Sequence, residues 1–337
     1  MLQTAEDIRL LNEKIGHSAT FIDKVHAEIG KVIVGQNHMV ERLLIGLLSN
    51  GHILLEGVPG LAKTLSIRSL ANTVNAQFSR IQFTPDLLPS DITGSTVYNQ
   101  KSGEFEIYHG PVFANIVLAD EINRTTPKTQ AALLECMEER QVTIEGTGHP
   151  LPSPFFVIAT QNNIELSGTY SLPEAQLDRF SARISIGYPD RAAEMQVLQN
   201  QRHSRPVDTI PAVATAEEIL EMQASVRDVH VDESVLGYIL DLVAFTRSLP
   251  SVSLGASPRG SLSLLYASQA RAAVQGRTYV RPDDVKALAP SILAHRIIVR
   301  PEQRVRGVTP ASCVAQALQQ VPVPVGNVAP LSPKFGG

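Results

Sequence analysis

The pattern of apolar and polar positions changes twice along this 337-residue chain. Apolar residues recur at helical spacing over residues 5–30 and 38–49. Helical segments then alternate with short apolar runs, which lie at 53–55, 81–83, 116–119, 155–159 and 183–186. Near-continuous apolar runs separated by helices are typical of a parallel sheet that is buried on both faces. We therefore predict the α/β class, with a three-layer αβα domain over residues 1–195.

Beyond about residue 190 the pattern becomes purely helical. Amphipathic helices are predicted at 191–203, 216–227, 232–248, 260–275 and 282–293. Pro206 and Pro211 fall at the change of character, so we place a boundary near 190–210 and an all-α domain over 205–305. Residues 307–337 are rich in Pro and Gly, and we expect them to form a flexible tail.

Two β-hairpins are predicted inside the first domain. Residues 94–110 contain two strand-like stretches around a turn at 99–103, and residues 141–151 repeat the pattern. The first hairpin carries Tyr98, Phe105 and Tyr108. These side chains either contact a client protein or line a pore, or they pack the hairpin on its own domain; the sequence leaves both readings open.

Composition narrows the class of protein. The net charge of -4 and the pI of about 6.1 argue against nucleic acid as a partner. The basic run Arg296, Arg300, Arg304 and Arg306 is expected to be a solvated face or a contact with a neighbouring subunit. Two distant cysteines, with Cys136 expected in the core, and the lack of any long apolar run lead us to expect a reduced, cytoplasmic protein without a membrane span.

A phosphate-binding loop follows the first predicted strand. Residues 52–56 lead into Gly57-Val58-Pro59-Gly60-Leu61-Ala62-Lys63-Thr64-Leu65 and then a helix. Backbone N–H groups at a helix N-terminus attract phosphate, and glycine lets the backbone approach closely. Lys63 is expected to contact the β- and γ-phosphates of ATP, and Thr64 to bind Mg²⁺. Ala62 departs from the usual motif, which has glycine there.

A pair of acids follows another buried strand. Residues 116–119 are apolar and end in Asp120 and Glu121. The carboxyl end of a strand is where α/β sheets place their ligands. We expect Asp120 to orient Mg²⁺ or its water, and Glu121 to act as the general base, or as the group that positions the attacking water.

These two motifs together resemble the AAA+ superfamily, and the rest of residues 5–305 resembles its MoxR family, in the clade with a helix-2 insert. Val34-Gly35-Gln36 is similar to the adenine-contacting stretch, and Asn162 to sensor 1. The segment 172–180 resembles the MoxR arginine-finger segment, with Arg179 as the finger. Arg259, in Gly255-Ala256-Ser257-Pro258-Arg259, resembles sensor 2. The 94–110 hairpin matches the insert, and Ala62 matches MoxR usage.

The resemblance implies an ATPase that forms a homo-oligomeric ring, expected to be a hexamer, with ATP and Mg²⁺ between the nucleotide domain and the helical lid. Arg179 would act in trans and Arg259 in cis, and hydrolysis would shift the lid against the core. The work implied is chaperone-like assembly, maturation or metal-cofactor insertion of a client complex, with a von Willebrand factor A domain protein as partner. The alternatives are a magnesium-chelatase-like subunit, a DNA-acting motor of the same clade, or an ATP-dependent scaffold with little hydrolysis.

Overall fold

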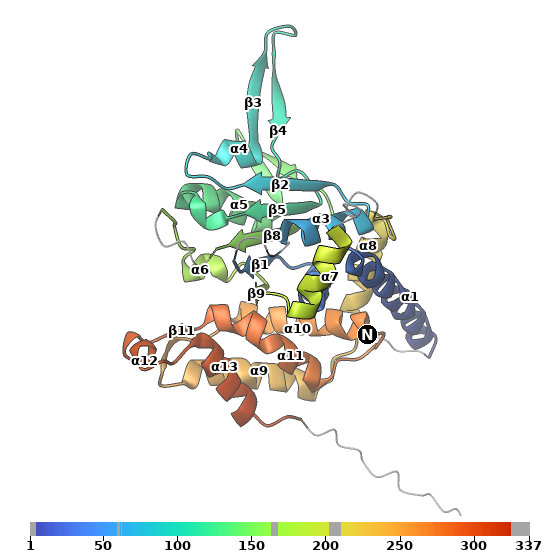
Figure 1. Ribbon diagram of the computed structural model, residues 1–337. Helices are drawn as coiled ribbons and strands as arrows, with labels where there is room; N and C mark the ends of the chain where they lie inside the picture. The colour runs from blue at the N-terminus through green and yellow to red at the C-terminus, as the bar shows by residue number, and fades with distance from the viewer. Residues whose placement is uncertain (1–4, 59–60, 62, 163–167, 202–209, 325–337) are drawn as a thin grey trace, which may run out of the picture.

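The structure is a computed structural model that describes residues 5–58, 61, 63–162, 168–201 and 210–324 (Figure 1). Its centre is a parallel sheet with the strand order β2-β5-β8-β1-β9. The five apolar runs of the sequence supply these strands, and the predicted α/β class is confirmed. Their bounds are Ile53–Glu56 for β1, Phe78–Gln82 for β2, Ile116–Asp120 for β5, Phe156–Gln161 for β8 and Ala182–Ser185 for β9.

Helices cover both faces of the sheet. Ile53, Ile116 and Ile158 contribute to a core that also takes in α1, α2 and α3, whereas Leu54 and Val117 contribute to a second core that takes in α5. Because alternate residues of a strand point to opposite faces, these two cores lie on opposite faces of the sheet, between the sheet and its covering helices. This is the arrangement of a three-layer domain. The helices are α1 (Ala5–Gly30), α2 (Asn37–Leu48), α3 (Lys63–Thr73), α4 (Pro89–Thr93), α5 (Pro127–Glu139), α6 (Glu174–Leu177) and the 3₁₀ helix η1 (Ile122–Arg124).

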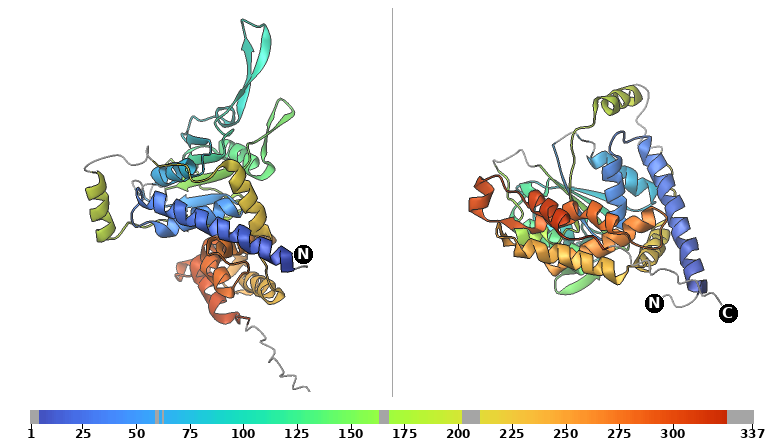
Figure 2. Two further views of the ribbon diagram at one scale, coloured as in Figure 1. Left: turned by 90° about the vertical axis from the view of Figure 1, so that its right-hand side faces the viewer. Right: turned by 90° about the horizontal axis from the view of Figure 1, so that it is seen from below.

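Both predicted hairpins are present. β3 (Gly94–Asn99) pairs with β4 (Glu104–His109), and β6 (Gln141–Ile144) pairs with β7 (Thr147–Pro150). The β3–β4 hairpin stands well clear of the sheet in Figures 1 and 2. Tyr98, Phe105 and Tyr108 are 52%, 72% and 74% exposed. The reading in which these three pack the hairpin on its own domain is therefore wrong.

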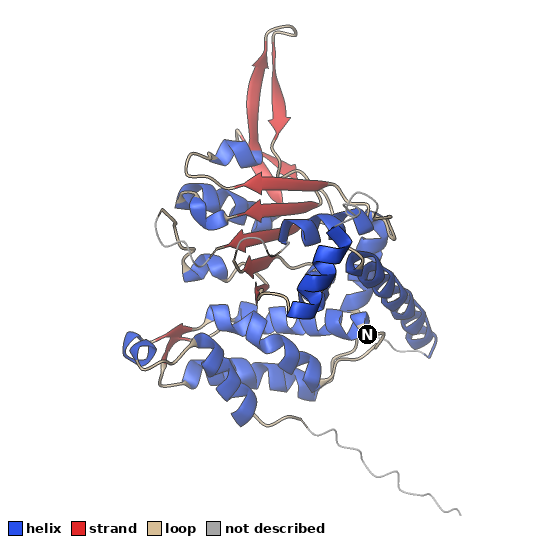
Figure 3. Ribbon diagram, in the orientation of Figure 1, coloured by secondary structure: helices blue, strands red, loops and turns tan. Residues whose placement is uncertain are grey.

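The second part of the chain is a compact group of helices with one small strand pair (Figure 3). The core that contains Ile53 and Ile158 continues into these helices, where it includes Leu242, Leu264 and Leu288. After α7 (Arg191–Gln201), the elements are α8 (Ala216–Arg227), α9 (Glu233–Ser248), β10 (Val252–Leu254), α10 (Pro258–Val274), α11 (Pro282–Leu293), η3 (Ala294–Arg296), β11 (Ile298–Val299), α12 (Pro301–Val305) and α13 (Pro310–Gln320).

The expected tail over 307–337 is wrong for its first half. Residues 310–320 form α13, which buries Cys313, Val314 and Ala317 against the lid. Thr309 caps this helix by accepting the Ser312 N–H at 3.1 Å, and Pro310 occupies the first helical position. The Pro and Gly content beyond the helix obscured this start signal. Residues 325–337 lie outside the described part of the chain.

No helix within the described ranges combines the length and the apolar character that crossing a bilayer requires.

Candidate nucleotide site and arginine pocket

The phosphate-binding loop joins β1 to α3, as the sequence predicts. Gly57 is required here by a close approach, because a Cβ atom at this position would lie 2.8 Å from the carbonyl oxygen of Ile186. Lys63 begins α3, and its Nζ donates to the carbonyl oxygen of Gly57 at 2.8 Å. Val58, Leu61, Thr64 and Leu65 are also described, whereas Pro59, Gly60 and Ala62 lie outside the described residues.

Lys63 and the two acids of β5 belong to one electrostatic site. Partial burial lowers the pKa of the Lys63 ammonium below its usual value, and the negative charges of Asp120 and Glu121 oppose that shift. Two motifs that are 57 residues apart in sequence therefore meet at the carboxyl edge of the sheet, which is where α/β proteins bind their ligands.

Asp120 is held from both sides. Its Oδ1 accepts the hydroxyl of Thr160 at 2.6 Å, and its Oδ2 accepts Arg80 Nη2 at 2.6 Å. Thr160 also accepts the Glu121 N–H at 2.8 Å, so one side chain of β8 fixes the backbone and the carboxylate at the end of β5. Such charge-assisted hydrogen bonds limit the rotation of Asp120.

Glu121 adopts an uncommon backbone conformation. Its φ of 59° and ψ of 49° lie in the left-handed region, which glutamate rarely occupies. Oε2 accepts Gln82 Nε2 at 3.0 Å and Arg124 Nη1 at 2.9 Å. Backbone strain of this kind gathers at functional sites, which suits the role predicted for this residue.

The stretch predicted to contact adenine lies beside the loop. Gly35 has a φ of +75°, and a Cβ atom there would come within 2.5 Å of the Cβ of Ala193. Gln36 Nε2 donates to the carbonyl oxygen of Gly187 at 3.3 Å. Since Ile186 packs against Gly57, the segment 186–193 connects Val34-Gly35-Gln36 to the phosphate-binding loop.

Asn162 follows β8 and is buried. Its carbonyl oxygen accepts Asn123 Nδ2 at 3.3 Å, and Asn123 lies two residues after Glu121. Asn162 therefore lies near the acids of β5, as its sensor assignment requires, while its catalytic role stays a prediction.

A Mg²⁺ ion fits the donors at this edge. Magnesium prefers oxygen ligands, and proteins commonly hold it with one or two carboxylates together with substrate phosphates. Asp120 supplies a partly exposed carboxylate, and Thr64 supplies a hydroxyl at the start of α3. Within the described ranges no cluster of three or more His, Cys, Asp or Glu side chains could hold a metal ion by itself. The donor set thus suits a metal shared with a nucleotide.

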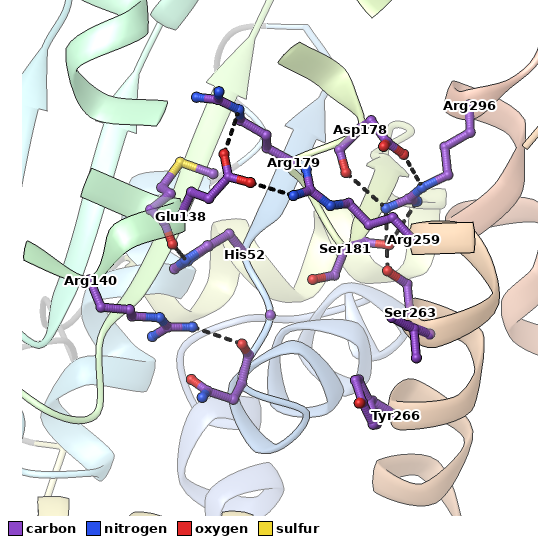
Figure 4. A pocket seen from close by; sticks show the side chains of 14 residues that line it. His52, Glu138, Arg140, Asp178, Arg179, Ser181, Arg259, Ser263, Tyr266 and Arg296 are labelled. Carbon is purple, nitrogen blue, oxygen red and sulfur yellow. Dashed lines mark hydrogen bonds and ion pairs between the residues drawn. The ribbon is translucent and has the colours of Figure 1, made fainter. Parts of the chain in front are cut away.

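The two predicted arginines lie together in one pocket (Figure 4). No described residue of the phosphate-binding loop lines this pocket. The arginines share the pocket, whose volume is about 280 Å³, with Gly51 and His52, the residues that precede β1. Arg179 Nε pairs with Glu138 Oε2 at 3.1 Å, and Arg259 Nη2 pairs with Glu138 Oε1. These contacts draw both guanidinium groups to the end of α5.

The structure does not bring Arg259 to the phosphate-binding loop of its own chain, as the cis assignment requires. Its pocket adjoins the amino end of β1, whereas Lys63 follows the carboxyl end of that strand. The four residues of β1 alone separate these ends by about 13 Å at 3.3 Å per residue. The position of Arg259 is set by where the lid packs on the core, which no local sequence pattern encodes.

Arg296 fastens the lid to the finger segment. Its side chain is 1% exposed, and Nε donates to Asp178 Oδ1 at 2.8 Å. Nη2 donates to the carbonyl oxygen of Phe180 at 2.8 Å, and Asp178 also accepts the Ser257 hydroxyl at 3.1 Å. The expectation that Arg296 forms part of a solvated or intersubunit basic face is wrong, because Arg296 points into the interior.

Sequence reasoning missed several residues of both sites. Thr160, Arg80 and Gln82 lie on strands, where the sequence alone gives them no distinguishing feature. The parallel register pairs Gln82 with Asp120, and only this register reveals their role. Glu138 gave one usable signal: it is an acid in the last turn of α5, where the helix dipole disfavours negative charge.

Comparison with known proteins agrees with this architecture. Residues 52–182 match the family described as "ATPase family associated with various cellular activities (AAA)", and residues 244–316 match the AAA lid domain. "Uncharacterized protein YeaC" of Bacillus subtilis is 49% identical over 308 residues, which cover 91% of this chain and 96% of that protein. "Chaperone MoxR1" of Mycobacterium tuberculosis is 42% identical over 318 residues, which cover 92% and 84%.

A crystal structure from Cytophaga hutchinsonii superposes with a TM-score of 0.88 at 43% identity, covering 95% of this chain and 99% of that one. The fold and the two motifs define a P-loop ATPase with a helical lid. The chain belongs to the MoxR family of AAA+ ATPases, and it binds a nucleotide and hydrolyses ATP.

Proposed function

We propose that the protein acts as a ring, hexameric by family resemblance, in which ATP hydrolysis drives chaperone-like assembly, maturation or metal-cofactor insertion of a client protein complex. The observation that carries the ring is the separation of Arg179 and Arg259 from the phosphate-binding loop of the same chain. Arginines that stabilise the transition state must reach the γ-phosphate. We therefore infer that they reach the γ-phosphate bound to a neighbouring subunit.

Each subunit would contribute two half-sites. One half binds ATP through the backbone of the loop and through Lys63, with Mg²⁺ on Thr64 and Asp120 to neutralise phosphate charge. Glu121 would take the proton of the attacking water, and Asn162 would help to hold that water. The other half presents Arg179 and Arg259 to the next subunit's nucleotide.

The lid would move together with the finger segment. Arg296 bonds to Asp178, Phe180 and Ser181, so the lid and residues 178–181 form one buried polar network. A change at the neighbour's γ-phosphate would therefore be passed to the lid of the subunit that supplies the arginines. In this proposal, each lid responds to the nucleotide of the neighbouring subunit and does not close over the nucleotide of its own subunit.

The client would meet the exposed hairpin. Tyr98 and Phe105 lie on one face of the hairpin with ring centroids 5.3 Å apart, and Tyr108 is also exposed. Exposed aromatic side chains are frequent anchors in protein–protein contacts. A von Willebrand factor A domain protein as the adaptor is proposed on the family resemblance alone.

The test measures ATPase activity per subunit against protein concentration, with Lys63→Ala as the blank. We expect specific activity to rise with concentration, because sites are completed between subunits. Mixing Arg179→Ala with Lys63→Ala subunits should restore activity that neither has alone, since mixed interfaces pair an intact loop with an intact finger. Failure to restore activity in rings that demonstrably co-assemble would refute the shared site.

A further inference from the structure

Glu138 joins the two arginines of the pocket. It lies in the last turn of α5, and each of its carboxylate oxygens accepts from a different guanidinium, Oε2 from Arg179 and Oε1 from Arg259 (Figure 4). Arg179 comes from the core and Arg259 from the first turn of the lid helix α10. One carboxylate therefore links two arginines that are 80 residues apart and belong to different domains.

The position of this acid is unfavourable without the arginines. Glu138 shares the last turn of α5 with other acids and no base, and helix carbonyls there repel negative charge. Its pKa nevertheless lies below the usual value, chiefly because Arg259 donates to it and because both arginines attract its negative charge. The arginines thus compensate for a placement that the helix alone disfavours.

The arginines need this acid in turn. The other nearby carboxylate, Asp178, is occupied by Arg296 and Ser257. Two guanidinium groups that share a pocket repel each other unless an anion lies between them. The side chains of Arg179 and Arg259 are 32% and 43% exposed. Without the Glu138 carboxylate, both guanidinium groups can therefore move apart and be solvated by water.

We propose that Glu138 is a positioning residue, which holds Arg179 and Arg259 side by side so that one γ-phosphate of a neighbouring subunit engages both. This inference rests on the proposed function. Glu138 acts through the arginines, and its carboxylate does not touch the nucleotide. The Arg179 pair uses Nε, so the two terminal nitrogens of that guanidinium remain available to a phosphate.

The first experiment compares Glu138→Gln with Glu139→Gln in the assembled protein. Glutamine has one acceptor oxygen and turns an N–H₂ group toward the second arginine, so one of the two contacts is lost. We expect kcat to fall by about 10- to 100-fold, the range that misplacement of a catalytic group produces, with KM for ATP unchanged within about twofold. Glu139, the exposed next residue, makes the same change in charge and should leave kcat unaffected. Glu138→Asp keeps both oxygens and should recover part of the loss.

The second experiment separates this inference from the proposed function. Glu138→Gln subunits mixed with Lys63→Ala subunits should regain activity, because mixed interfaces combine an intact loop with intact arginines. Suppose that Arg179→Ala subunits regain activity when mixed with Lys63→Ala subunits, and that Glu138→Gln shows full activity alone. The ring is then supported and the role of Glu138 is overturned. If Glu138→Gln is defective and is not rescued, the acid acts within its own subunit, and the inference also fails. If Arg179→Ala is not rescued, the proposed function itself is wrong.

Discussion

Removing the charge of Asp178 tests whether the lid is held to the core as the structure indicates. In Asp178→Asn, the Arg296 guanidinium keeps its carbonyl partners but loses its only carboxylate partner among the described residues. Burial lowers the pKa of Arg296 to about 10, and the negative charge of Asp178 opposes that shift. The variant thus leaves a buried cation that nothing neutralises.

The size of the effect follows from the burial of the two partners. Breaking a buried ion pair by removing one partner costs about 3–5 kcal/mol. Arg296 is 1% exposed, but Asp178 is 25% exposed, so water compensates in part. The carbonyl contacts of Arg296 also persist. We therefore expect a loss somewhat below that range, about 2–3 kcal/mol. At roughly 2.1 cal/mol/K of unfolding entropy per residue, this loss lowers the Tm of a 337-residue chain by about 3–4 °C.

Differential scanning calorimetry would measure this loss, with hydrogen exchange to locate it. Because two-domain proteins can unfold in steps, exchange should show which domain opens first. We expect faster exchange in α10, α11 and residues 178–181, while β5 and β8 remain protected. Asp241→Asn, an exposed charge removal on α9, is the control and should shift stability by no more than about 0.5 kcal/mol. Equal Tm values for Asp178→Asn and the unmodified protein would refute the anchoring role of the pair.

Three further predictions concern the nucleotide site and the core. Thr160→Val removes the hydroxyl that donates to Asp120 and accepts the Glu121 N–H. We expect the free energy of unfolding, measured in urea, to fall by about 1–3 kcal/mol, and kcat to fall as well. An unchanged kcat would contradict the role given to Thr160. Gly57→Ala forces a Cβ atom toward the carbonyl oxygen of Ile186, and it should weaken nucleotide binding by at least about tenfold in calorimetric titration. The control is Gly237→Ala on α9, where a Cβ atom meets open space. It should leave nucleotide binding unchanged and stabilise the protein by about 0.5–1 kcal/mol. His52 is buried, and its pKa is lowered to about 3, chiefly by desolvation, so below pH 6.5 the unfolded chain binds a proton at this residue that the folded chain does not. His52 alone should therefore reduce stability by up to about 1.4 kcal/mol per pH unit between pH 6.5 and 4, and His52→Gln should remove this contribution, whereas exposed His230→Gln should not.

The nucleotide half of the site could be predicted because its motifs are local. A strand, a glycine-rich loop and a helix N-terminus bind phosphate by their own backbone geometry, so the order of residues from His52 to Leu65 was enough. The hydrophobic runs likewise fixed the strands, since each had to be buried on both faces. The supporting residues of β2 and β8 escaped prediction because their partners depend on strand order.

The sequence by itself determined the class of protein, the five core strands, the loop with Lys63 and the acids Asp120 and Glu121. Each of these follows from residue spacing within a single segment. Only the tertiary structure decided that Arg259 lies beside Arg179 on Glu138, and that Arg296 lies inside the protein. The physical reason is that these ion pairs join residues 41 to 121 positions apart, and their geometry is set by where the lid packs on the core rather than by any local pattern.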